Sequence, residues 1–149
     1  MPAIVVISLR GSNRRQACDE QLLRLGLPFE FVDAIDGRSL SEVEVEKSYQ
    51  SILNLTKFKR PMTRSEIGCY LSHRAVWARA RDEARTFVVL EDDFSLADGF
   101  KSFFSAIPAH IQRDCLLKLD VQDGQRPRFQ SKSTFNVGPV VVGSFRMIQ

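Results

Sequence analysis

The most informative stretch of the chain is Phe87-Val88-Val89-Leu90-Glu91-Asp92-Asp93, an apolar run that ends in three acids. Such a run is typical of a strand buried on both faces of a sheet, and in open α/β sheets ligands bind outside the carboxyl ends of the strands. Adjacent carboxylates repel each other, by about 1 kcal/mol at 4 Å in water and about 4 kcal/mol near a protein surface. We therefore expect a cation at this strand end.

The spacing of the acids favours two of them as ligands. In an extended segment Glu91 and Asp93 point to one side and Asp92 to the other. A hard divalent ion such as Mg²⁺ takes one or two carboxylates and leaves positions for phosphate oxygens. This pattern predicts a metal site with Glu91 and Asp93 as ligands. The alternative is an acidic turn in which Asp92 or Asp93 caps a helix that begins near Ser95.

The composition limits the class of protein. The 149 residues correspond to one domain, predicted to span residues 1–149, and 44% hydrophobic with 26% charged residues is typical of a folded soluble protein. The net charge of +3 is compatible with phosphate-bearing ligands or with peripheral association with an anionic membrane, and it is too small to indicate nucleic-acid binding.

The cysteines and the N-terminus bear on location. Cys18, Cys69 and Cys115 are far apart and form no C-x-x-C pair, which indicates neither a disulfide framework nor a zinc motif and favours a reducing compartment. The apolar residues 3–7 follow no basic region, and Arg10 ends the stretch, so we expect a first strand there and no signal peptide or membrane span. A cytoplasmic location is the resulting expectation.

Strands and helices alternate along the sequence. Apolar runs predict strands at Ala3–Leu9, Phe29–Val32, Phe87–Leu90, Leu116–Leu119 and Val137–Gly143. Helices are predicted from Ser12 or Asn13 to Leu25, over 41–53, over Arg64–Ala84 and over Ala97–Ala106, with irregular connections at 54–62 and 122–133. The alternation predicts an α/β fold, a three-layer sandwich with a mostly parallel central sheet.

Several local signals support these boundaries. Thr63 with Glu66 forms a capping box, and so does Ser39 or Ser41 with the glutamate three residues later. In the helix that starts at Arg64, the apolar face is predicted to comprise Ile67, Leu71, Ala75 and Ala78. Gly68 and Ser72 are one turn apart and predict the close approach of another element, and Gly37 is expected to take positive φ in a turn.

Three ordered stretches together resemble glycosyltransferase family 25, which includes lipooligosaccharide and collagen hydroxylysine galactosyltransferases. They are Val6-Ile7-Ser8-Leu9 with Arg14-Arg15, then Phe29-Glu30-Phe31-Val32-Asp33-Ala34-Ile35-Asp36-Gly37, and finally Thr63 to His73 continuing to Val89-Leu90-Glu91-Asp92-Asp93. The resemblance covers about residues 4–105. It implies a GT-A-like fold, a UDP-sugar donor such as UDP-galactose, a Mn²⁺ or Mg²⁺ ion, and inverting transfer to a lipooligosaccharide or related glycan.

The resemblance also implies roles for individual residues. Glu91 and Asp93 match the metal-binding positions of the family's DXD-like acidic motif, and Asp93 would help to stabilise the leaving diphosphate. Donor-binding candidates are Ser8, Arg14, Arg15, Asp36, Glu66, His73 and Asp92. Structural alternatives remain open: a solvated helix face for the two arginines, turn chemistry for Asp36, a helix cap for Glu66 and a hydrogen-bonded structural role for His73.

The C-terminal part departs from the family pattern. Family members are usually longer, so we expect a chain truncated after the donor-binding half. An inverting transferase needs a general base, and Asp120 is the predicted one, with Asp123 as the other candidate. The alternative function is therefore a non-catalytic remnant that acts as a binding or partner module. Truncation would also leave a sheet edge that a homodimer would cover.

Overall fold

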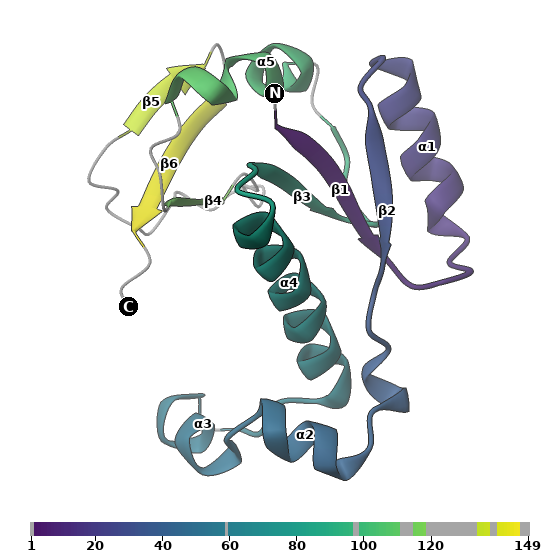
Figure 1. Ribbon diagram of the computed structural model, residues 1–149, viewed down its shortest axis with the longest axis vertical. Coiled ribbons are helices and arrows are strands. Elements are labelled where there is room, and N and C mark those ends of the chain that lie inside the picture. The colour runs from purple at the N-terminus through teal and green to yellow at the C-terminus, as the bar shows by residue number, and fades with distance from the viewer. Residues whose placement is uncertain are drawn as a thin grey trace. The chain divides into compact units, whose positions relative to one another are not determined.

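The structure is a computed structural model (Figure 1). It describes residues 2–58, 60–96, 99–110, 115–118, 134–137 and 140–146, with side chains described in 2–56, 60–96 and 99–107. Two compact units divide the chain: Ala3–Ser95 forms one, and Met1–Pro2 with Leu96–Gln149 forms the other. Each unit is described by itself below.

A three-stranded parallel sheet organises the first unit. Its strands are β1 (Ala3–Ser8), β2 (Phe29–Asp33) and β3 (Phe87–Glu91), in the order β2-β1-β3. The central strand β1 is buried almost throughout, as its β-branched sequence predicts. The predicted α/β class with a parallel sheet is therefore confirmed, and all three predicted strands of this region are present.

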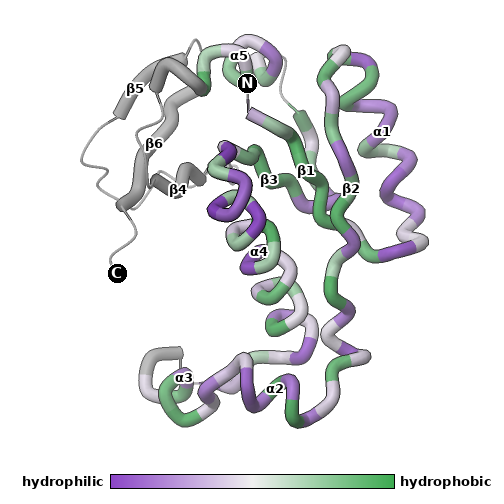
Figure 2. The backbone as a smooth tube through the Cα atoms, viewed as in Figure 1, coloured by the Kyte–Doolittle hydropathy of each residue, from purple (hydrophilic) through white to green (hydrophobic). Residues whose placement is uncertain are grey.

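Helices cover both faces of this sheet. Successive side chains of a strand point to opposite faces, and Val5 and Ile7 of β1 pack with Val76 of α4 (Arg64–Asp82). Helix α1 (Arg14–Arg24) contacts β1 and buries Cys18 and Leu22. Figure 1 shows α1 and α4 on the two sides of the sheet, and Figure 2 shows the hydrophobic residues concentrated in the strands between them. These three layers are the predicted sandwich.

The buried face of α4 differs from the predicted one. Buried positions in α4 are Ile67, Gly68, Ser72 and Val76, whereas Ala75 is exposed and Leu71 and Ala78 are half-buried. The physical reason is the partner: the N-terminal half of α4 packs on the backbone of residues 35–37. A Cβ on Gly68 would lie 2.6 Å from the Ile35 carbonyl oxygen, and the Ser72 hydroxyl accepts a hydrogen bond from the Ile35 amide at 2.8 Å. The close approach predicted at Gly68 and Ser72 is confirmed.

Gly37 is required for a different reason from the predicted one. Positive φ occurs at Gly11 and Gly26 but not at Gly37, which lies in the short 3₁₀ helix η1 (Gly37–Ser39). A Cβ on Gly37 would lie 1.8 Å from the Arg64 carbonyl oxygen. Gly37 therefore provides space for the start of α4, and the expectation of positive φ was wrong.

The segment between β2 and α4 contains two helices in place of the single one predicted over 41–53. They are α2 (Glu42–Ser48), which the Ser41–Glu44 capping box begins, and α3 (Ser51–Phe58), which occupies part of the connection predicted as irregular. Tyr49 has an extended backbone, and its hydroxyl accepts a hydrogen bond from the Met62 amide at 2.9 Å. This tertiary contact accompanies the break between the helices.

The second unit contains α5 (Phe100–His110) and an antiparallel sheet of β4 (Cys115–Lys118), β5 (Thr134–Val137) and β6 (Val140–Arg146) in the order β4-β6-β5. Helix α5 continues through Pro108 to His110, whereas the sequence predicted a helix that ends at Ala106, before this proline. The predicted strand Val137–Gly143 is a pair, because β5 ends at Val137 and β6 begins at Val140. The loop predicted over 122–133 lies outside the described residues. Within the described helices, none combines the length and apolar character needed to span a membrane.

Candidate functional site

The candidate site lies at the switch point of the parallel sheet, where the strands that follow β1 are placed on its two opposite sides. From β1 the chain passes through α1 to β2 on one side, and β3 later pairs with β1 on the other side. At such a switch point the helices diverge to opposite faces and leave a crevice outside the carboxyl ends of the strands, where α/β proteins bind ligands. The last paired residues here are Ser8 with Asp33, and Ile7 with Glu91.

Both carboxylate oxygens of Asp92 accept hydrogen bonds on the α1 side of this strand end. Its Oδ2 accepts hydrogen bonds from Ser8 at 2.7 Å and Ser12 at 3.0 Å, and its Oδ1 accepts one from Arg14 at 3.2 Å. The side chain is only 16% exposed. Burial alone would raise the pKa of Asp92, but the three hydrogen bonds outweigh it and hold this pKa below its ordinary value. Asp92 therefore ties the end of β3 to β1 and to the start of α1.

Arg15 makes a second link, between β1 and β2. Its guanidinium donates to the Ser8 carbonyl oxygen at 2.9 Å and to Asp33 at 2.5 Å, and it lies 4.8 Å from the centre of the Phe31 ring. In the part of the chain with described side chains, the Arg15 Nε is the buried side-chain atom without a hydrogen-bond partner. Arg14 and Arg15 thus pair with acids at the strand ends. These contacts do not support the alternative in which the two arginines form only a solvated helix face.

On the α4 side, Glu91 meets two residues of the helix. Its Oε1 lies 3.2 Å from the Nε2 of His73, and the ligand atoms of Cys69, His73 and Glu91 all lie within 4.8 Å of one another. Glu91 is 56% exposed and His73 is 23% exposed. Partial burial, followed by the Glu91 carboxylate, raises the pKa of the Cys69 thiol. This trio is open to solvent on one side, in contrast to Asp92.

Asp93 stands apart from both groups. Strand β3 ends at Glu91, and Asp92 and Asp93 form a turn, so strand alternation extends only to Glu91. Asp93 is exposed and has no hydrogen-bond or ion-pair partner among the residues whose side chains are described. The acidic turn of the alternative interpretation is thus confirmed, but its helix cap was wrong, because neither Asp92 nor Asp93 caps a helix near Ser95 and α5 begins at Phe100. The extended geometry from which Glu91 and Asp93 were predicted to point to one side therefore does not reach Asp93, and their role as metal ligands stays a prediction.

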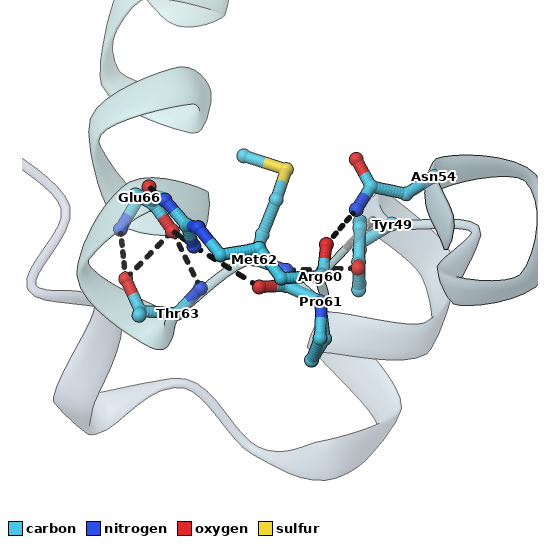
Figure 3. A network of polar contacts seen from close by, with 7 residues as sticks. All are labelled: Tyr49, Asn54, Arg60, Pro61, Met62, Thr63 and Glu66. Carbon is cyan, nitrogen blue, oxygen red and sulfur yellow. Dashed lines mark hydrogen bonds and ion pairs between the residues drawn. The ribbon is translucent and has the colours of Figure 1, made fainter. Parts of the chain in front are cut away.

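Glu66 is committed to the start of α4. It forms the predicted capping box with Thr63, and both its oxygens accept hydrogen bonds from Arg60, at 2.9 and 2.5 Å (Figure 3). The Arg60 side chain, followed by the Thr63 amide and hydroxyl, lowers the pKa of Glu66 to about 2. Seven residues of helix place Glu66 about 10 Å along the axis from His73. The structure therefore does not bring Glu66 to the strand-end cluster.

Asp36 also has a local partner. Its carboxylate accepts hydrogen bonds from the Arg38 side chain at 2.8 to 3.2 Å and from the Arg38 amide at 3.0 Å, and it caps η1. The Arg38 side chain lowers the pKa of Asp36. These contacts agree with the turn chemistry of the sequence, and Asp36 is not part of the cluster around Asp92.

Sequence reasoning missed two members of the cluster. Ser12 was considered only as a helix cap, but its hydroxyl donates to Asp92. Cys69 was considered only for paired-cysteine motifs, although its spacing of four residues from His73 places both on one helix face. That i, i+4 spacing was the signal available in the sequence. Asp120, the predicted general base, lies outside the described residues.

Comparison with known proteins identifies similar sequences. A family model described as glycosyltransferase family 25 (LPS biosynthesis protein) matches residues 1–147. A glycosyltransferase 25 family member of Anopheles gambiae is 38% identical over 117 residues, covering 74% of this chain and 19% of that protein. Procollagen galactosyltransferase 2 of Homo sapiens is 33% identical over 107 residues, or 66% and 16% respectively. Inactive glycosyltransferase 25 family member 3 of Mus musculus is 34% identical over 108 residues, or 66% and 17%. The chain thus spans about a fifth of the length of these relatives, or less.

Proposed function

Because the chain belongs to glycosyltransferase family 25, we propose that it binds a UDP-sugar, UDP-galactose first among them, and transfers the sugar with inversion to a lipooligosaccharide or related glycan acceptor. The galactosyltransferase name of the human relative supports the choice of sugar. The location of the cluster, at the switch point of a parallel sheet, supports the choice of binding site.

One observation carries this proposal: the middle acid of the triplet is shielded and hydrogen-bonded to three side chains, while its two neighbours are exposed to solvent. Asp92 accepts hydrogen bonds from Ser8, Ser12 and Arg14, whereas Glu91 and Asp93 are exposed. Glu91 and Asp93 would hold a Mn²⁺ or Mg²⁺ ion, which would supply positive charge next to the diphosphate of the donor. The occupied Asp92 keeps the acidic turn fixed against β1 and α1.

The basic residues of the cluster would act on the donor from the α1 side. Arg14 is 60% exposed and uses only its Nη1 for Asp92, which leaves further donors for phosphate oxygens. Ser8 is buried at the end of β1 and spends its hydroxyl on Asp92, so its contribution to the donor would be to position that acid. Asp120, on the sequence prediction, would accept the proton of the attacking hydroxyl.

The test is a calorimetric titration of the full chain with UDP and UDP-galactose, with and without Mn²⁺. We expect Mn²⁺-dependent binding that Asp93→Asn weakens at least tenfold, because the substitution removes one proposed ligand and keeps the side chain's size. Glu46→Gln is the matched control, since it removes the charge of an exposed glutamate on α2. Binding that is the same without metal, or an equal loss in both variants, would contradict the proposal.

A second function has a specific observation in its favour. The mouse relative named inactive is as similar to this chain as the human galactosyltransferase is, at 34% against 33% identity. A non-catalytic module that binds a nucleotide sugar or a partner protein is therefore the alternative. Transfer of radiolabelled galactose to a lipooligosaccharide acceptor, lost in Asp120→Asn but with donor binding retained, would decide for the enzyme.

A further inference from the structure

We propose that Cys69, His73 and Glu91 form a binding site for one borderline-soft divalent ion of the Zn²⁺ class. This site shares Glu91 with the proposed donor site and goes beyond it through Cys69 and His73, and its occupation requires neither a nucleotide nor Asp93. Cys69 and His73 come from one face of α4, and Glu91 is the last residue of β3. All three ligand types bind zinc in proteins.

The distances come close to those of a formed site. Two nitrogen or oxygen ligands about 2.1 Å from an ion, at a tetrahedral angle, are about 3.4 Å apart, and a sulfur ligand is about 3.6 Å from either. The His73 Nε2 and the Glu91 Oε1 are already 3.2 Å apart. The longest separation in the trio is at most 4.8 Å, so an adjustment of about 1 Å, within reach of a side-chain rotation at the exposed Cys69, would complete the geometry.

The donor set distinguishes this site from the carboxylate pair proposed for Mn²⁺. Thiolate sulfur and imidazole nitrogen select zinc and similar ions, whereas Mn²⁺ and Mg²⁺ prefer oxygen ligands. Three protein ligands also leave a fourth position for water or another small ligand, as in catalytic zinc sites. The exposure of Glu91 and Cys69 gives that position access to solvent.

The scaffold fixes the two helical ligands. Gly68 and Ser72, each next in sequence to a ligand, are the positions through which α4 packs on residues 35–37. This contact sets the rotation of the helix about its axis, and the rotation directs Cys69 and His73 toward the end of β3. The Trp77 ring, with its centre 5.9 Å from that of His73, packs beside the imidazole one turn further along. Sites built on such rigid elements need little ordering when the ion binds.

Co²⁺ provides the direct test, because a cobalt–thiolate bond produces a charge-transfer absorption band and tetrahedral coordination produces intense visible bands. We expect the full chain to bind one Co²⁺ with both features, and Zn²⁺ to displace it. Cys69→Ser should abolish the charge-transfer band, and His73→Ala should weaken binding at least tenfold. Cys18→Ser is the matched control, because Cys18 is buried on α1 and should leave the spectrum unchanged. A band that persists in Cys69→Ser, or cobalt binding without a thiolate band, would overturn the proposal.

Two further measurements keep the outcome clear. Mass spectrometry of the wild-type chain after alkylation should show that Zn²⁺, but not Mn²⁺, slows modification of Cys69, and equal modification with and without Zn²⁺ would also overturn the proposal whether or not the variants fold. Asp93→Asn should keep the cobalt–thiolate band. If the cobalt–thiolate band is present but Mn²⁺-dependent nucleotide binding is absent, the zinc site stands and the proposed function fails. If nucleotide binding is present but the band is absent, the proposed function stands and the zinc site fails.

Discussion

Glu91 and Asp92 are neighbours in the sequence, yet they lie on different sides of the sheet and in different chemical states. Asp92 faces α1, is 16% exposed and accepts hydrogen bonds from three side chains. Glu91 faces α4, is 56% exposed and has His73 as its polar partner among the described side chains, with the Cys69 sulfur within 4.8 Å. We refer to these as the closed side, comprising Asp92, Ser8, Ser12 and Arg14, and the open side, comprising Glu91, His73 and Cys69.

The difference shows how one acidic run can serve structure and ligand binding at once. Glu91 is the last residue of β3 and contacts His73 of α4, whereas Asp92 is the first residue of the following turn and contacts Ser12 and Arg14 at the start of α1, so each acid takes its environment from a different helix. On the closed side, Ser8, Ser12 and Arg14 direct hydrogen bonds to Asp92 and so hold the end of β3 against β1, and Arg14 alone keeps further donors exposed to solvent. The open side has capacity left for a ligand, because α4 presents a thiol and an imidazole there in place of arginine and serine.

The largest expected effect concerns the contact between Gly37 and the start of α4, the helix that carries Cys69 and His73 of the open side. Gly37→Ala should lower the free energy of unfolding by about 3 kcal/mol or more, because its Cβ would lie 1.8 Å from the Arg64 carbonyl oxygen and would push the start of α4 away. Urea denaturation followed by circular dichroism measures the change. If the open side depends on this contact, Co²⁺ binding in the folded variant should weaken as well.

A second glycine provides the control for Gly37. Gly11 has φ of +78°, but a Cβ at this position would meet no atom within 4 Å, so Gly11→Ala should cost only the strain of the left-handed backbone, about 1 kcal/mol. Equal losses for the two substitutions would contradict the assignment of Gly37 to a steric contact, and they would leave the position of α4 without its proposed anchor.

The next effect compares the two acids directly. Asp92→Asn should lower the free energy of unfolding by about 2 kcal/mol, because hydrogen bonds to a charged and shielded acceptor are lost or weakened. Glu91→Gln should change it by less than about 0.5 kcal/mol in metal-free buffer, as expected for an exposed residue. Similar losses for both substitutions would remove the distinction between a closed and an open side.

The pH dependence of this difference follows from the pKa of Asp92. Its folded-state pKa lies below the ordinary value of 3.8, so the stabilisation by the carboxylate is complete above that value and is lost as the pH falls through the lower, folded-state pKa. The gap in stability between the wild-type chain and Asp92→Asn should therefore be constant near neutral pH and narrow in acid. Denaturation curves over this pH range measure the gap, and a gap that widens in acid would have the wrong sign.

Local signals in the sequence predicted the parts of the fold that depend on local physics. The run of β1 is apolar and buried because both of its faces are covered, and this property is visible in the sequence alone. Strand β3 is equally apolar from Phe87 to Leu90, but it is an outer strand in the order β2-β1-β3 and only Val88 is fully buried, so the expectation of burial on both faces was wrong for this strand. The start of α4 was predicted because the Thr63–Glu66 capping box is a local arrangement. The strand-end location of the acidic cluster follows in turn from the parallel order of the strands.

The features that the sequence did not predict depend on contacts between distant residues. Gly37 was assigned to a turn because its partner, the Arg64 carbonyl, is 27 positions away. The buried face of α4 was assigned to Leu71 and Ala75 because apolar residues usually face a core, whereas the helix here packs its small residues on a backbone segment. Cys69 and His73 share a helix face by spacing, but Glu91 joins them only through the register of β3 against β1.

The smallest expected effect tests whether several hydrogen-bond partners are enough for a carboxylate to stabilise the fold when it is exposed to solvent. Glu66 accepts hydrogen bonds from Arg60 and Thr63, as Asp92 does from its own partners, but it lies at the solvent-exposed start of α4. Its pKa is lowered from 4.5 to about 2, so any stabilisation is present above pH 4.5 and is lost toward pH 2. Glu66→Gln should therefore lose less stability than Asp92→Asn near neutral pH, because solvent screens exposed ion pairs, and its stability should fall less steeply in acid than that of the wild-type chain.

Glu46→Gln, measured alongside by the same denaturation series, controls for removal of a negative charge. If Glu66→Gln proves as destabilising as Asp92→Asn, the number of partners matters more than shielding from water, and the closed side owes its strength to its hydrogen bonds alone.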